Sequence, residues 1–202
     1  MKEGFVYLDA ALPGVFWDAK YATADNLTGS VVDGYDANRV VGTREMAEAL
    51  SRAIPRAARH GFGLLLWDGY RPQRAVDCFL RWARSPEDGK TKARYYPNIG
   101  KQDLVPLGYL AERSGHSRGS AIDLTLCDPA TGQTTEMGGT FDLMDARSHH
   151  GARGLSPEAA QNRALLREIM EKCGFDAYEQ EWWHYSLKKE PYPDRSFDFP
   201  IE

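Results

Sequence analysis

The sequence predicts an α+β domain with a mostly antiparallel central sheet and flanking helices. Segments with strand character, 63–68, 120–126, 140–143 and 177–187, are separated by turns and helix-like segments in no strict β-α-β rhythm. The chain has 202 residues, which is enough to bury one full core without disulfides. No stretch has the composition of a linker, so we expect residues 1–202 to form a single domain.

Three helices are predicted from apolar residues at helical spacing. The first follows Thr43, a suitable N-cap, and Pro55 inside its pattern predicts a kink or break near Ser51. The second begins at Pro72, because proline suits the first turn of a helix. The third follows the cap residue Ser156.

The predicted strand 120–126 has the clearest alternation in the chain. Ile122, Leu124 and Leu126 fall on one face, which we expect to pack against the core. Asp123 falls on the opposite face among small neighbours, which leaves room above its carboxylate.

Composition restricts the partners and the compartment. Hydrophobic residues make up 42% and charged residues 27%, which excludes a disordered, collagen-like or coiled-coil chain. A net charge of −4 makes nucleic acid and an anionic membrane poor candidate partners. No apolar run has the length of a signal peptide or membrane span, so a cytoplasmic location is expected. The three widely separated cysteines form no Cys-x-x-Cys pair and are expected to be free thiols.

Residues 85–113 form a long connection without clean periodicity. A loop of this length in a compact domain usually has a function. We therefore expect it to act as a lid over a site or as a contact in a homodimer.

His116 and Asp123 are the first candidates for chemistry. His116 lies on a segment rich in glycine and serine that can fold back over the strand carrying Asp123. An imidazole nitrogen and a carboxylate oxygen would then meet at a metal ion. The alternative is a turn followed by a strand, in which both side chains have ordinary structural roles.

The segment Glu181-Trp182-Trp183-His184 supplies two more candidates. In an ideal strand Glu181 and His184 point to opposite faces, because their spacing of three is odd. If both face one site, Glu181 must lie in the turn before the strand or beside a bulge. The alternative is a strand whose aromatic residues build the core while Glu181 is solvated.

Taken together, His116, Asp123 and His184 offer two nitrogens and one oxygen. Three protein ligands with a fourth position open for water are typical of catalytic zinc, whereas structural zinc sites are closed. Glu181 would then be the general base on that water. The His-Glu-x-x-His signature is absent, which excludes a thermolysin-like enzyme.

These motifs resemble those of the zinc D,D-peptidases, which share a fold with the hedgehog signalling domain. Their motif pairs Ser-x-His-x-x-Gly-x-Ala-x-Asp with Glu-x-Trp-His, and both parts are complete here, at 114–123 and 181–184. Further segments, such as 17–23, 68–72 and 141–142, are similar to the D-Ala-D-Ala dipeptidases of the VanX type. The resemblance covers nearly the whole chain.

The resemblance implies roles around the reacting atoms. One zinc ion would be held by His116, Asp123 and His184. Glu181 would be the catalytic base, and Arg71 would stabilise the oxyanion. Asp68, three residues before Arg71, either orients this guanidinium or is an ordinary turn residue.

The implied substrate is a free dipeptide. A methyl group contributes only about 1–3 kcal/mol of discrimination, so recognition must depend on the charged ends. By resemblance, Asp142 with Tyr21 would bind the ammonium, and Ser114 would help to bind the carboxylate. The expected reaction is zinc-dependent hydrolysis of D-Ala-D-Ala to two D-alanines, in vancomycin-type resistance or D-alanine recovery. The alternatives are a zinc D,D-carboxypeptidase or endopeptidase acting on peptidoglycan, and a non-catalytic zinc-binding module.

Overall fold

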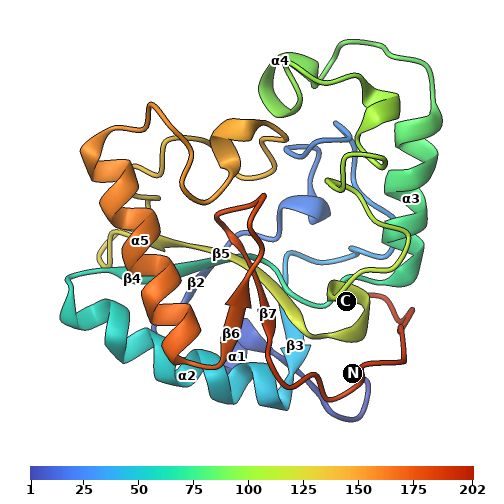
Figure 1. Ribbon diagram of the computed structural model, residues 1–202. Helices are drawn as coiled ribbons and strands as arrows, with labels where there is room; N and C mark the ends of the chain where they lie inside the picture. The colour runs from blue at the N-terminus through green and yellow to red at the C-terminus, as the bar shows by residue number, and fades with distance from the viewer.

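A five-stranded sheet organises the computed structural model, which describes residues 1–202 (Figure 1). Its strands follow the order β2-β4-β5-β7-β6, and only the β2–β4 pair is parallel. Their bounds are β2 (Phe16–Trp17), β4 (Gly63–Asp68), β5 (Ala121–Cys127), β6 (Phe175–Ala177) and β7 (His184–Leu187). A separate antiparallel pair joins β1 (Phe5–Tyr7) to β3 (Val41–Thr43). The predicted α+β class is confirmed.

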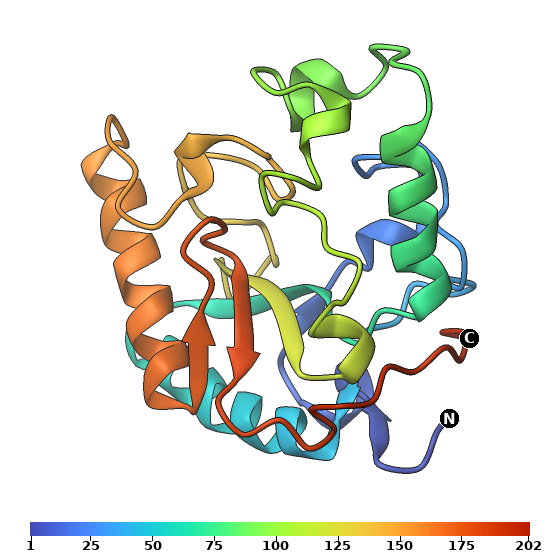
Figure 2. The same cartoon turned by 45° about the vertical axis from the view of Figure 1, so that its right-hand side comes forward.

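Two long helices, α2 (Arg44–Arg59) and α5 (Pro157–Lys172), cover one face of the sheet. The other face is overlaid by α3 (Gln73–Arg84) and the long connections around the short helix α4 (Lys92–Tyr95), as Figure 2 shows from a second side. A further short helix, α1 (Leu8–Ala11), follows β1. The two termini lie close together, and the Tyr7 hydroxyl donates to the Glu202 carbonyl at 2.8 Å. No helix combines the length and apolarity needed to cross a membrane.

Helix α2 begins where the sequence predicts and runs without interruption. The Thr43 hydroxyl accepts a hydrogen bond from the Met46 N–H at 3.3 Å, as an N-cap should. The predicted break near Ser51 is wrong. Pro55 removes one backbone hydrogen bond, but the apolar face on both sides of it stays buried, and this packing holds the helix together.

Two strand predictions need correction. Residues 140–143 form a turn, in which the Leu143 N–H donates to the Thr140 carbonyl. The segment 177–187 is divided into β6 and β7 by a turn over residues 178–183. In both cases apolar side chains are buried from irregular backbone, so the hydrophobic pattern alone does not reveal the turn. The three cysteines are free, as expected.

Candidate active site

The start of β5 and the start of β7 bring the predicted metal ligands together. His116 lies in a short 3₁₀ helix just before β5, and Asp123 on β5 pairs in register with His184 on β7. His116 Nε2 lies 3.2 Å from His184 Nδ1 and 3.3 Å from Asp123 Oδ2, and His184 Nδ1 lies 3.0 Å from Asp123 Oδ1. Ligands about 2.0–2.1 Å from a tetrahedral zinc ion are separated by similar distances.

Neighbouring groups favour the metal-binding forms of His116 and Asp123. His116 Nδ1 lies 2.7 Å from the Gly69 carbonyl, to which it donates, so the lone pair of Nε2 faces the cluster. Burial opposes ionisation of Asp123, but the close contacts with His116 and His184 outweigh it and lower the pKa of this carboxylate. The residues therefore fit a metal ion.

Glu181 lies in the turn between β6 and β7, as required if it faces the same site as His184. Its Oε2 is 3.8 Å from His184 Nδ1, and the residue is buried. Burial, assisted by the charge of Asp123 and opposed by Arg71, raises the pKa of Glu181 to about 8. A metal cation would act in the opposite direction, because it favours the carboxylate.

Arg71 reaches the cluster from the segment that follows β4. Its Nε donates to Asp68 Oδ2 at 2.9 Å, and its Nη2 lies 3.5 Å from Asp123 Oδ2. An irregularity in the pairing of β4 with β5 brings Asp68 opposite Asp123, although the two strands are otherwise in simple register. The second oxygen of Asp68 accepts from the Tyr35 hydroxyl at 2.6 Å. This geometry favours the orienting role of Asp68 over that of an ordinary turn residue.

Asp142 is a buried carboxylate without a cationic partner. It is 3% exposed, and its hydrogen-bond partner is the Tyr21 hydroxyl, which donates to Oδ2 at 2.8 Å. Burial, assisted by the charge of Asp123, raises its pKa well above the usual value, and the Tyr21 hydrogen bond and the charge of Arg71 do not offset this effect. Its φ of 61° lies in the left-handed region, which is uncommon for a residue other than glycine. A ligand cation would relieve the cost of this burial.

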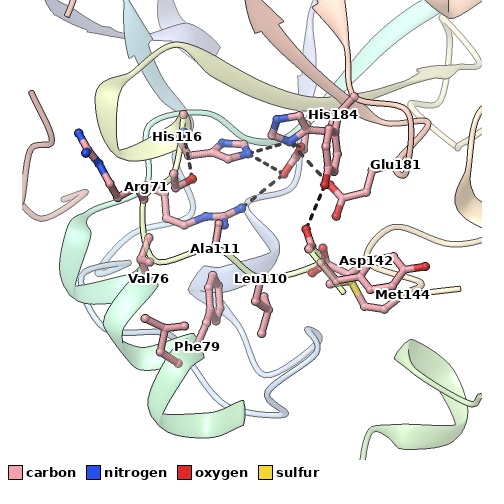
Figure 3. A pocket seen from close by; sticks show the side chains of 18 of the residues that line it. Arg71, Val76, Phe79, Leu110, Ala111, His116, Asp142, Met144, Glu181 and His184 are labelled. Carbon is pink, nitrogen blue, oxygen red and sulfur yellow. Dashed lines mark hydrogen bonds and ion pairs between the residues drawn. The ribbon is translucent and has the colours of Figure 1, made fainter. Parts of the chain in front are cut away.

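These groups line one cavity of about 230 Å³ (Figure 3). The predicted site residues that line it are Tyr21, Arg71, Ser114, His116, Asp123, Asp142, Glu181 and His184. Asp68 lies behind Arg71 and does not line the cavity. The cavity is smaller than the pockets of drug-sized ligands, so it suits a small substrate.

Comparison with known proteins identifies the family. The family model described as D-Ala-D-Ala dipeptidase matches residues 1–202. The D-alanyl-D-alanine dipeptidases of Streptomyces coelicolor and Enterococcus faecium are 60% and 58% identical to this chain, over 100% of both chains in each pair. The chain belongs to the D-Ala-D-Ala dipeptidase family. The Escherichia coli relative is 36% identical over 90% of this chain and 83% of its own. A family of metallopeptidases agrees with the candidate metal site at His116, Asp123 and His184.

Sequence reasoning missed several residues of the dipeptidase cavity. Val76 and Phe79 belong to the second predicted helix, and their spacing suggests no role in a site. In the structure this face of α3 also lines the cavity, and the Phe79 ring lies 5.1 Å from Arg71 Cζ. Spacing identifies an apolar face but not which part of it borders a cavity.

The long connection 85–113 supplies one wall of the cavity through residues 108–111 and Arg113. Two hydrogen-bonding contacts join this wall to segments later in the chain. The Tyr109 hydroxyl lies 3.0 Å from His149 Nε2, and the Tyr178 hydroxyl donates to the Gly108 carbonyl at 3.1 Å. The placement agrees with the expected lid. A homodimer contact stays a prediction.

Proposed function

We propose that this chain hydrolyses the free dipeptide D-Ala-D-Ala to two D-alanines, with one zinc ion held by His116, Asp123 and His184. One observation carries the proposal: Asp142 is buried, forms no ion pair, and lines the same small cavity as His116, Asp123 and His184. Such a carboxylate suits the ammonium of a free dipeptide. The names of the similar proteins support the same substrate.

The N,N,O ligand set suits zinc. When bound, zinc polarises the substrate carbonyl and favours deprotonation of the attacking water. The Glu181 carboxylate accepts the proton from that water and then donates it to the leaving nitrogen. Arg71, held by Asp68, faces the negative charge that develops on the carbonyl oxygen, where its fixed guanidinium is an effective partner.

The ends of the substrate are bound on either side of this centre. Asp142 and Tyr21 receive the ammonium, and Ser114 helps to hold the carboxylate. Ser114 lines the cavity and its Oγ accepts from the His116 N–H at 3.2 Å, which fixes it beside the metal ligands. The substrate is thereby oriented with its peptide bond near Glu181.

Longer peptidoglycan peptides fit this cavity poorly. In such a substrate the ammonium is replaced by an amide, and the chain must continue past Asp142. Asp142 and Tyr21 are both almost fully buried, which argues against room for a continuing chain on that side. The structure therefore favours the dipeptidase over the carboxypeptidase or endopeptidase alternative. Resistance or D-alanine recovery as the physiological role, and a cytoplasmic location, stay predictions.

The test measures release of free alanine from D-Ala-D-Ala, from L-Ala-L-Ala and from a pentapeptide that ends in D-Ala-D-Ala. We expect hydrolysis of the first alone, its loss with a chelator and its recovery with zinc. Efficient cleavage of the pentapeptide would overturn the proposed substrate. Glu181→Ala should keep zinc but lose nearly all turnover, whereas a non-catalytic module would show no turnover in the parent chain either.

A further inference from the structure

A buried arginine outside the cavity has no acidic partner. Arg163 on α5 is 3% exposed, and no carboxylate lies within ion-pair distance of its guanidinium. Burial lowers its pKa to about 10, with a longer-range opposing contribution from Glu136, so it stays charged at neutral pH. Burying a charge without an opposite partner is costly. The groups that do contact Arg163 must therefore compensate this cost.

The hydrogen-bond partners of Arg163 are backbone carbonyls, and its guanidinium also lies 5.4 Å from the centre of the Trp182 ring. Nε donates to the Met137 carbonyl at 2.6 Å, and Nη1 donates to the carbonyls of Arg147 at 2.8 Å and His149 at 3.3 Å. These acceptors lie at the two ends of the segment 137–149. The fixed fork of one guanidinium therefore joins both ends of this segment to α5.

The segment 137–149 carries the side chain that faces the substrate ammonium. Asp142 lies near its middle, with its left-handed backbone conformation. Such a conformation persists only where the surrounding structure constrains it. The segment has few regular backbone hydrogen bonds of its own, beyond one 3₁₀ turn at 146–148. Its anchors to the rest of the fold must therefore supply the constraint.

We propose that Arg163 is a positioning residue for substrate binding, because it fixes the two ends of the segment 137–149 and thereby holds Asp142 in the cavity. The inference rests on the proposed dipeptidase function. The neighbouring Asn162 reinforces the same anchor, since its Nδ2 donates to the Glu136 carbonyl at 2.9 Å. Arg167, one turn further along α5, is half-exposed and paired with glutamates, so it lacks this arrangement.

The test compares Arg163→Met and Arg163→Lys in the zinc-loaded protein, with kcat, KM, zinc content and melting temperature as readouts. Displacement of Asp142 weakens ammonium binding, so KM for D-Ala-D-Ala should rise about tenfold or more, with kcat changed less than about threefold. Zinc content should be unchanged. Arg163→Lys keeps the charge but not the forked guanidinium, so it should also raise KM. If the methionine variant does not fold, the lysine variant alone provides the test. Lys172→Met, which removes an exposed charge from the same helix, is the matched control.

A double-mutant cycle separates positioning from general destabilisation. If Arg163 acts through Asp142, the Arg163→Lys change should have little further effect on kcat/KM in an Asp142→Asn background. Independent, multiplicative losses, or a parent-like KM in both Arg163 variants, would overturn the inference. Absence of D-Ala-D-Ala hydrolysis by the parent protein would instead overturn the proposed function.

Discussion

Asp68→Asn tests whether the orientation of Arg71 matters for the reaction. The substitution keeps the shape of the side chain but removes the charge that faces Arg71 Nε at 2.9 Å. With the amide oxygen toward Arg71, a hydrogen bond to a neutral acceptor remains, and the amide nitrogen can donate to the Tyr35 hydroxyl, which donates to the carboxylate in the parent protein. A hydrogen bond between charged groups contributes about 1.5–3 kcal/mol and a neutral one about 0.5–1.5 kcal/mol. The difference of about 1.4 kcal/mol corresponds to a tenfold effect on a rate.

The loss should appear in kcat, because in the proposed mechanism Arg71 faces charge that develops only as the carbonyl is attacked. We therefore expect kcat for D-Ala-D-Ala to fall about tenfold in Asp68→Asn, with KM nearly unchanged. Steady-state kinetics at saturating zinc measures both constants. Asp33→Asn, which breaks an exposed pair with Arg81, is the control and should behave like the parent protein. A raised KM with unchanged kcat would refute this account of Arg71.

Three further predictions concern stability. Gly119 has a φ of +71°, and a Cβ there would lie 2.6 Å from the Phe5 ring, so Gly119→Ala should lower the free energy of unfolding by about 1–3 kcal/mol in a denaturant titration. Burial lowers the pKa of His150 to about 4, against about 6.5 in the unfolded chain. The folded protein should therefore lose stability as the pH falls from about 6.5 to 4, and His150→Asn should make the melting temperature less dependent on pH in this range. Removing zinc with a chelator should lower the melting temperature, because the ion joins His116 to the start of β7, and an unchanged temperature would contradict the ligand set.

The sequence predicts that His116, Asp123 and His184 lie together, and the structure brings them together around one pair of strands. Alternation along β5 places Asp123 away from the core, and the spacing argument requires Glu181 to leave the strand before His184. Both features depend on short-range backbone geometry. The family motifs then connect two segments about sixty residues apart, which spacing alone cannot do.

The other side of the cavity was harder to predict because distant contacts determine it. The apolar residues around Asp142 suggest a strand, but the hydroxyl of Tyr21, which is 121 positions away, meets this carboxylate in a turn. Arg163 lies in a helix where a charged residue is expected at the surface, and its burial depends on carbonyls from the segment 137–149. Local propensity contains no information about either contact.

Charge balance explains why the cavity suits both a divalent cation and an ammonium group. Four buried carboxylates, those of Asp68, Asp123, Asp142 and Glu181, share Arg71 as the guanidinium near them. The raised pKa values of Glu181 and Asp142 express the cost of this excess negative charge. In the proposed function, a metal ion at the histidine cluster would compensate one side of the cavity, and a substrate ammonium at Asp142 would compensate the other. Because the two positive charges act on different carboxylates, metal and substrate stabilise the same arrangement without competing for a ligand.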